Sequence, residues 1–442
     1  MTKDYPSYRA SGIAWMPKIP AHWETIPLKR SFRILSGATP RSSIAEYWDG
    51  DIVWITPADY KTQDKYIRKG SRNITPEGYS SCSTNMIPRG SIIFSKRAPI
   101  GTIAINDIEL CTNQGCLSCI PLKNVSATYY YYLLSSFTDI FEAHASGSTF
   151  KEISATTFGN IKLPIPPREE QEQIVRFLDW KVSAIDKLIA TKKHQLCSLT
   201  ALNSTMEKNL VLLGFDAAYP KNPPSADWKE NIPAHWKIRP LKRIFKILSG
   251  ATPKSEIPEY WDGNIAWITP ADYKTQDKYI SHGSRNITEA GYASCSTNMI
   301  PRGSIIFSKR APIGTVAIND IELCTNQGCL SCIPIKDASA TYYYYLMSCF
   351  TDVFEMNASG TTFKEISATT FGNMKVPFPP INEQKKIAAY LDARHTKYAR
   401  FAETTQKEII VLNELKTRLI SDAVTGKIDV RSIKLPNFAK EE

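Results

Sequence analysis

Up to Ile165, the chain alternates between short apolar runs and residues that break regular structure. Runs rich in β-branched and aromatic side chains lie between Gly, Pro and Asn, a pattern that is typical of strands. It predicts strands over residues 51–55, 91–95, 102–105 and 116–120. Residues 127–143 carry apolar side chains at helical spacing instead. One face of that helix would present Tyr130, Leu133, Leu134, Phe137 and Phe141. The pattern therefore predicts an α+β fold.

This pattern occurs twice along the chain. The sequence aligns with itself without a gap when Ser81 is placed on Ser294, and residues 81–102 then recur letter for letter at 294–315. We call this superposition the repeat alignment. Between residues 21–163 and 234–376, 116 of 143 positions are identical. A period this long indicates two copies of a domain and not a solenoid. Arg68/Ser281 and Lys69/His282 are among the sharpest differences between the copies.

A proline stop ends each copy, and a long stretch without proline follows it. Residues 169–213 and 382–424 carry narrow apolar stripes with spacings of three, four and seven, the pattern of a helix–helix seam. About 40 residues of helix form a rod of about 60 Å. We expect the two rods to pair antiparallel, because each leads out of an equivalent domain. The predicted organisation is a first domain (1–167), a central helical spacer (168–213), a second domain (214–380) and a C-terminal helical spacer (381–442), related by a pseudo-two-fold axis.

Charge and composition narrow the class of partner. The 442 residues include 54 Lys and Arg against 43 Asp and Glu, a net charge of +11 that favours a polyanion. The sequence contains neither an apolar run of about 18 residues nor an N-terminal secretory pattern. Its ten cysteines are therefore expected to be reduced thiols in the cytoplasm.

Motifs for catalysis are missing from the sequence. It contains no G-x-x-x-x-G-K-[ST] loop, no G-x-G-x-x-G after a strand and no H-E-x-x-H. The short match to an amino methyltransferase signature at residues 222–225 lacks the aromatic residue and the upstream glycine-rich loop. We therefore expect no catalytic residue, and the chain is not expected to be an enzyme by itself.

The cysteine spacing allows an alternative that we weigh and set aside. Cys111, Cys116 and Cys119 have the C-x4-C-x2-C spacing of a plant-type iron–sulfur site, but no matching fourth cysteine follows in both copies. Small buried side chains on strands are the better interpretation, and no metal site is expected. Similarly, His22-Trp23 is interpreted as a structural turn, and at least half of the tyrosines at 129–132 as core.

Polar and basic loops provide chemistry that suits DNA. Lys96 and Arg97 follow a strand and can donate to guanine edges or to phosphate, whereas the amides of Asn113 and Gln114 match adenine. Other loops offer hydroxyls, backbone amides and charges for phosphate. Each loop alone would suit a solvated surface, and only the set indicates nucleic acid. The candidate DNA-binding residues are Thr39, Arg41, Lys61, Thr62, Gln63, Lys96, Arg97, Asn113, Gln114, Lys151, Thr252, Lys254, Lys274, Thr275, Gln276, Lys309, Arg310, Asn326, Gln327 and Lys364.

Taken together, the motifs resemble a known family, the specificity subunits of type I restriction–modification systems. The resemblance covers essentially the whole chain: two domains alternating with two helical regions, the IPAHW segments, the LSGATP turn, the helix starts LPIPPREEQ and VPFPPINEQ, and the closing LISDAVTGKIDVR. Members of this family usually carry dissimilar recognition domains, whereas these two are nearly alike.

The resemblance implies a non-enzymatic subunit whose two target recognition domains read a bipartite DNA sequence. Two modification subunits would dock on the helices and methylate adenine with S-adenosylmethionine. Restriction subunits, motor–nucleases that need ATP and Mg²⁺, would join them. The expected docking residues are Ile185, Leu188, Leu199, Phe401, Leu412 and Leu415. No cofactor is expected in this chain.

Two alternatives stay open: an autonomous DNA methyltransferase or nuclease, and a tandem binding module for a ligand other than nucleic acid. The near identity of the copies adds a prediction, because alike domains related by a two-fold axis should read an interrupted palindrome.

Overall fold

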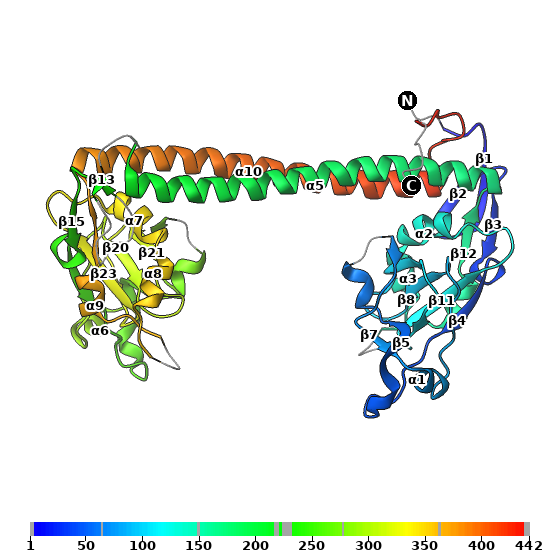
Figure 1. Ribbon diagram of the computed structural model, residues 1–442, viewed down its shortest axis with the longest axis horizontal. Coiled ribbons are helices and arrows are strands. Elements are labelled where there is room, and N and C mark those ends of the chain that lie inside the picture. Colours follow the sequence, from blue (N-terminus) through cyan, green and yellow to red (C-terminus); the bar gives the residue numbers. More distant parts are fainter. Residues whose placement is uncertain are drawn as a thin grey trace. The chain divides into compact units, whose positions relative to one another are not determined.

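The computed structural model (Figure 1) describes residues 4–62, 65–147, 151–215, 221–222, 232–275, 278–360 and 364–436, with the backbone alone at 61–62, 221–222 and 274–275. The chain forms two compact units, Met1–Lys192 with Gln406–Glu442, and Lys193–Thr405. The two boundaries, after Lys192 and after Thr405, fall at equivalent positions of the repeat alignment, so the division repeats with the sequence. Each unit holds one copy and part of each long helix. The division into four segments made from the sequence remains a prediction.

A five-stranded sheet forms the centre of the first unit, in the order β4-β11-β8-β9-β6. The first four strands are antiparallel neighbours, and β6 lies parallel to β9 at the edge. Every residue of β8 and β9 is buried, so both faces of the sheet are covered. The strands are β4 (Phe32–Ser36), β6 (Tyr66–Ile67), β8 (Ile92–Ser95), β9 (Ile103–Asn106) and β11 (Cys116–Pro121).

Smaller sheets and short helices complete this copy. A three-stranded sheet has the order β10-β5-β7, and β1–β2 and β3–β12 form separate antiparallel pairs. The strands are β1 (Tyr8–Ile13), β2 (Met16–Pro20), β3 (Glu24–Pro27), β5 (Trp48–Ile55), β7 (Arg72–Ile74), β10 (Cys111–Thr112) and β12 (Lys162–Ile165). The helices are η1 (Leu28–Arg30), η2 (Ala45–Tyr47), η3 (Asp59–Thr62), α1 (Pro76–Ser80), α2 (Ala127–Ser135), α3 (Thr138–Ala143) and α4 (Ala155–Asn160).

The predicted strands are confirmed, but the helix predicted over residues 127–143 is two helices, α2 and α3. Phe137 leaves the helical conformation between them, with φ −126° and ψ 28°. Its ring packs against Trp15 of the β1–β2 hairpin, with ring centroids 4.6 Å apart. The break between α2 and α3 therefore lies at a residue whose packing partner is distant in sequence.

The second unit repeats this architecture strand for strand in its two larger sheets, β16-β23-β20-β21-β18 and β19-β17-β22. Its strands are β13 (Lys221–Asn222), β14 (Ile232–Pro233), β15 (Lys237–Pro240), β16 (Phe245–Ser249), β17 (Trp261–Ile268), β18 (Tyr279–Ile280), β19 (Arg285–Ile287), β20 (Ile305–Ser308), β21 (Val316–Asn319), β22 (Cys324–Thr325), β23 (Cys329–Pro334) and β24 (Lys375–Phe378). Its helices are η4 (Leu241–Arg243), η5 (Pro258–Tyr260), η6 (Asp272–Thr275), α6 (Glu289–Ala293), α7 (Ala340–Ser348), α8 (Thr351–Met356) and α9 (Ala368–Asn373).

Two long helices, α5 (Arg168–Leu213) and α10 (Ile381–Val424), each contribute one part to each unit. In the first unit, Asp186 of α5 pairs with Lys416 of α10 at 2.7 Å, and Lys192 pairs with Glu408 at 2.6 Å. In the second unit, Arg394 donates to Asn203 at 2.8 Å, and the Tyr398 and Thr200 hydroxyls lie 2.6 Å apart. Residue numbers rise along one helix as they fall along the other. The helices therefore pack antiparallel within each unit, and the predicted α+β fold class with two long helices is confirmed.

A buried carboxylate joins the start of α5 to the IPAHW segment. Glu170 accepts hydrogen bonds from the Trp23 indole at 3.1 Å and the Tyr5 hydroxyl at 2.5 Å, and His22 lies 2.7 Å away. Trp23 is buried, so the structural interpretation of this turn is confirmed. Glu383 repeats the contacts with His235 and Trp236 at the start of α10.

The central sheet of the first unit has two ends with different neighbours. Ser36, Ser95 and Cys116 lie together where β4 and β8 end and β11 begins. We call this the loop end. β6 and β9 finish at the opposite end, where Ile67 pairs with Asn106.

We call this second end the helix end, because the adjacent Lys65 reaches α5. Its ammonium lies 2.7 Å from the carboxylate of Asp179, which also accepts a hydrogen bond from Tyr132 of α2 at 2.5 Å. Lys278, Asp392 and Tyr345 repeat this contact in the second unit. Among the described residues, no helix is long and apolar enough to span a membrane.

Candidate nucleic-acid interface

Three candidate loops from distant parts of the sequence meet at the loop end of the sheet. The Ala38 amide donates to the Thr112 carbonyl oxygen at 3.0 Å, and the Lys96 amide donates to that of Gly115 at 2.9 Å. Gly37 allows this approach, because a Cβ there would lie 2.1 Å from the Thr112 oxygen. The loops at 36–41, 95–101 and 112–115 therefore form one surface, and the second unit repeats it.

Two tryptophans that the sequence analysis did not single out hold the first of these loops. The Trp54 indole donates to the Ala38 oxygen at 3.0 Å, and that of Trp48 to the Arg41 oxygen at 3.3 Å. The two rings pack edge to face with centroids 5.1 Å apart, and the Arg72 guanidinium lies 4.1 Å from the Trp48 centroid. Their signal was present in the sequence as the repeated segments YWDG and WITPADY.

The two neighbouring amides of the 112–115 loop have different surroundings. Gln114 is exposed and accepts a hydrogen bond from the exposed Thr39 hydroxyl, which leaves its amide nitrogen as the donor on this surface. Asn113 is half-buried, and its oxygen accepts from the Gly115 amide at 2.9 Å. Gln114 therefore presents its amide outward, whereas Asn113 shapes the turn. Gln327 with Thr252, and Asn326 with Gly328, repeat these contacts.

A carboxylate absent from the sequence candidates holds the basic pair. Glu152 lies 2.8 Å from the Lys96 ammonium and 2.7 Å from Nε of Arg97. The side chain of Lys96 is only 11% exposed, against 46% for Arg97. Lys96 therefore supports the loop from inside through its ion pair with Glu152. Arg97 is the member of the pair with an exposed guanidinium. Glu365 holds Lys309 and Arg310 in the same way.

The charges around Glu152 favour its ionised form. Partial burial raises the pKa of Glu152, but the hydrogen bonds and charges of Lys96 and Arg97 outweigh it, so the net shift is downward. Glu365 has the same downward shift of its pKa. The neighbouring Lys151, and Lys364 in the other copy, are exposed and extend the basic surface. The exposed Arg41 and Lys254 lie in the 36–41 loop and its repeat.

Part of the candidate set lies outside the described residues. That part consists of the side chains of Lys61, Thr62, Lys274 and Thr275 and of the whole of Gln63 and Gln276. The start of the same loop is described: the Asp59 carboxylate accepts from the backbone amides of Thr56 and Ser71, both at 2.7 Å.

The three cysteines with the C-x4-C-x2-C spacing are buried side chains on strands. Cys111 lies on β10, and Cys116 and Cys119 on β11. Burial raises the pKa of Cys111 to about 11 and that of Cys116 to about 12. The thiols of Cys111 and Cys116 are therefore protonated near neutral pH, and both side chains pack as small apolar groups. Within the described ranges, no group of three or more His, Cys, Asp or Glu side chains is placed to hold a metal ion.

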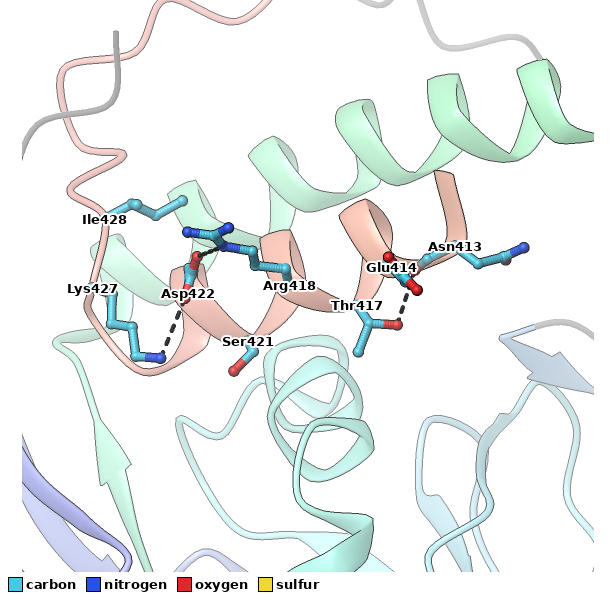
Figure 2. A pocket seen from close by; sticks show the side chains of 8 residues that line it. All are labelled: Asn413, Glu414, Thr417, Arg418, Ser421, Asp422, Lys427 and Ile428. Atoms are coloured by element: carbon cyan, nitrogen blue, oxygen red, sulfur yellow. Dashed lines mark hydrogen bonds and ion pairs between the residues drawn. The ribbon is translucent and has the colours of Figure 1, made fainter. Parts of the chain in front are cut away.

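A hollow of about 840 Å³ lies away from these loops, on the last turns of α10 (Figure 2). Three of its charged side chains pair with one another: Asp422 with Arg418 and with Lys427, each at 3.4 Å. In the repeat alignment these charged positions correspond to Thr205, Asn209 and Gly214. The hollow is therefore not part of the duplicated surface.

The candidate docking residues on the helices divide into two groups. Leu188, Phe401 and Leu415 are 46%, 43% and 49% exposed, whereas Ile185, Leu199 and Leu412 are half-buried. Leu202, at 57% exposure, joins the exposed group. Leu188 and Phe401 are equivalent in the repeat alignment, and so are Leu202 and Leu415. Each unit therefore repeats one exposed apolar pair with a residue from each helix, Leu188 with Leu415 and Phe401 with Leu202. Among the described residues α10 also exposes Tyr390, Ile410 and Val411, but their equivalents in the repeat alignment are Phe177, Cys197 and Ser198, so these positions do not repeat as exposed large apolar residues.

Comparisons with known proteins agree on one family. The model of the type I restriction modification DNA specificity domain matches residues 20–198 and 233–411. The chain is 29% identical over 434 residues to the type I restriction enzyme MjaIX specificity subunit of Methanocaldococcus jannaschii, covering 94% of this chain and 96% of that protein. It is 22% identical to the EcoDI specificity subunit of Escherichia coli, over 93% and 90% of the two chains.

Solved structures share the fold. The HsdS subunit from Thermoanaerobacter tengcongensis matches with a TM-score of 0.57 and 18% identity over 92% of this chain and 98% of that one. A chain from a structure of the type I R-M system, described in terms of complex assembly and conformational transition, matches with a TM-score of 0.73 at 18% identity, over 92% and 99%.

Proposed function

The chain belongs to the family of type I restriction–modification DNA specificity proteins, whose family model matches both of its repeats, and we propose that it selects the DNA target of such a complex through the two loop ends. The curated relatives are named specificity subunits, a non-catalytic component of these systems. The net charge of +11 suits a protein that binds DNA, which is a polyanion.

The convergence of the three loops at the loop end is the observation that carries this proposal. Exposed Gln114 offers an amide that suits the adenine edge, and exposed Arg97 a guanidinium that suits guanine or phosphate. Lys151 and Arg41 add charge for the phosphate backbone. Separate polar loops would not provide base-reading and phosphate-binding groups on one surface.

We infer that the two domains read the same short sequence in opposite orientations. The loops at 95–101 and 112–115 are identical in both copies, and the 36–41 loop differs only by Arg41/Lys254. The parts of α5 and α10 are exchanged reciprocally between the units, since each unit takes the first part of one helix and the second part of the other. Reciprocal exchange of equivalent parts is typical of a two-fold arrangement. A two-fold arrangement calls for an inverted repeat in the DNA.

Two modification subunits of one kind are the proposed partners on the helices. The support is the repetition of the exposed apolar pairs, Leu188 with Leu415 and Phe401 with Leu202, once in each unit. The methyltransferase chemistry and its S-adenosylmethionine, and the ATP and Mg²⁺ of a restriction subunit, would belong to the partners. The cytoplasm, which holds the chromosomal target and keeps thiols reduced, is the proposed location.

DNA binding at two salt concentrations tests the proposal. Full-length chain with its modification subunits is titrated against duplex DNA at 50 mM and 200 mM salt. A specific complex with several phosphate contacts should lose on the order of 10³-fold or more in affinity over this range. Binding with no salt dependence would instead favour a ligand other than nucleic acid. Methyl transfer to DNA by the chain alone would favour an autonomous methyltransferase.

A further inference from the structure

A cluster of charged side chains at the helix end distinguishes the first unit from the second. Asp107 accepts from Nε of Arg68 at 2.6 Å and forms an ion pair with Arg89 at 2.7 Å. The side chains of Arg68 and Arg89 are 70% and 73% exposed, whereas that of Asp107 is 17% exposed. In the second unit Ser281 replaces Arg68, and Asp320 has the Arg302 ion pair at 2.6 Å.

The local charge differs accordingly. In the first unit Arg68 and Arg89 pair with Asp107, and the exposed Lys69 follows Arg68 in the chain, so these four residues carry a formal net charge of +2. In the second unit the equivalent residues are Ser281, His282, Arg302 and Asp320, with a formal net charge of zero when histidine is neutral, and Arg302 pairs with Asp320. This contrast stands out because the loops proposed to read DNA are nearly the same in both copies.

The position of the cluster separates it from the DNA-reading loops. Arg68 follows β6 and Asp107 follows β9, so both stand at the helix end of the sheet. β8, with four residues, runs from this end to the loop end, which is about 13 Å of strand.

The same end lies beside the proposed docking helix. Lys65, three residues before Arg68, is fixed to Asp179 of α5. Leu188 of the exposed apolar pair follows Asp179 by nine residues, about 13 Å along the helix. A protein seated on Leu188 and Leu415 would therefore lie on the same helix that Lys65, close to this cluster in the chain, contacts.

We propose that the cluster of Arg68, Lys69, Arg89 and Asp107 docks an acidic surface of the modification subunit bound to the first unit, so that the two units bind the same partner with unequal affinity. The inference rests on the proposed function, because it takes the modification subunit as the partner. Two additional positive charges on the surface of the first unit would strengthen its site by roughly 3- to 10-fold at low ionic strength and by less at high salt.

Exchange of residues between the copies tests the inference. Arg68→Ser with Lys69→His gives the first unit the residues of the second, and Ser281→Arg with His282→Lys does the reverse. Each substitution installs a residue that this fold already carries at the equivalent position, and circular dichroism checks folding. Binding of the purified modification subunit to the full chain is measured by calorimetry at low and high salt. Glu24→Lys, which changes the charge of the first unit at another place, is the control.

The expected wild-type result is two binding steps with unequal dissociation constants. The first double variant should weaken the tighter step until the two are equal, and the second should strengthen the weaker step to the same end. Glu24→Lys should leave the ratio unchanged. Equal steps in the wild type, or a ratio that neither exchange alters, would overturn the inference while leaving the proposed function intact. A change in the salt dependence of DNA binding with no change in partner binding would also overturn it and assign the cluster to phosphate. Absence of any binding to the modification subunit would contradict the proposed function itself.

Discussion

The hydroxyl of Tyr129 in α2 donates a hydrogen bond to the backbone oxygen of Val424 at the end of α10, 3.3 Å away. At the equivalent positions Tyr342 donates to the oxygen of Val211 at 2.7 Å. Each copy is thus completed by the end of the helix that follows the other copy. The reciprocal exchange between the units is therefore built into their cores.

Removal of residues 406–442 should loosen the first unit and spare the second. This segment supplies Ala423, Val424 and Val430 to the core of the first unit, all fully buried. Each buried valine contributes about 1.5–3 kcal/mol. Hydrogen exchange measured by mass spectrometry should show faster exchange in α2 and the β1–β2 hairpin, and unchanged protection in α7. Equal loss of protection in both units would contradict the assignment of this segment to the first.

Glu152→Gln combined with Glu365→Gln should destabilise the protein by about 1–3 kcal/mol at pH 7, because the nearly buried Lys96 and Lys309 lose their counter-charge. The pKa of Glu152 is lowered in the folded state. The carboxylate therefore adds stability above the ordinary glutamate pKa, and this part is lost as the pH falls through the lowered value. Urea unfolding at pH 7 and at pH 3 should show a difference between variant and wild type that shrinks at the acidic pH. Glu142→Gln, at an exposed position of α3, is the matched control and should change little.

Gln114→Leu combined with Gln327→Leu should relax base preference at one position of each half-site. A bidentate amide contact to adenine contributes about 1–3 kcal/mol of discrimination. Binding to a set of duplexes with single-base changes measures this directly. Lys151→Ala with Lys364→Ala is the comparison, because loss of a phosphate contact should weaken all sequences alike and flatten the salt dependence. A uniform loss of affinity in the glutamine variant would show that Gln114 does not read a base.

Lys96 and Arg97 should behave differently when replaced one at a time. Arg97→Ala with Arg310→Ala removes an exposed guanidinium and should weaken DNA binding with little loss of stability. Lys96→Ala with Lys309→Ala should lower the free energy of unfolding, because these side chains are only 11% and 14% exposed beside a carboxylate. Thermal unfolding and DNA titration of both variants separate the roles. Unchanged DNA affinity of the arginine variant would exclude this loop from the interface.

Charge introduced at the exposed apolar pairs should remove one modification subunit at a time. Leu188→Glu with Leu415→Glu alters the first unit, and Leu202→Glu with Phe401→Glu alters the second, at positions 43–57% exposed. Each pair serves as the control for the other, since both keep the helix seam. Native mass spectrometry should count one bound modification subunit in each variant and two in the wild type. Two bound subunits in both variants would place the docking surface elsewhere.

Much of the fold could be predicted from local patterns. The four strands lie in β5, β8, β9 and β11, and the proline stops at residues 163–167 and 376–380 give the starts of the long helices to within a few residues. These features depend on periodicity and on breaker residues, which act over a few positions. The break between α2 and α3 escaped prediction, because Phe137 contacts Trp15, which lies near the other end of the copy.

The sequence predicted which residue types make up the candidate site, but not how those residues contact one another. The sequence drew attention to Lys96 and Gln114 by residue type, but their partners Glu152 and Thr39 come from other loops. Register across the sheet, which no local pattern encodes, decides that Gln114 faces outward and that Lys96 is nearly buried. The contact of each copy with the end of the other copy's helix could not be predicted either. The residues around Val211 and Val424 lie outside the nearly identical segment and differ from one another.

Sequencing of methylated adenines in a host that carries this chain with its modification subunit tests the central claim most directly. Two recognition domains with 116 of 143 positions identical, exchanged reciprocally through their helices, predict one interrupted motif whose two half-sites are the same short sequence on opposite strands. Two unrelated half-sites, or the same half-site repeated in one direction, would contradict the account.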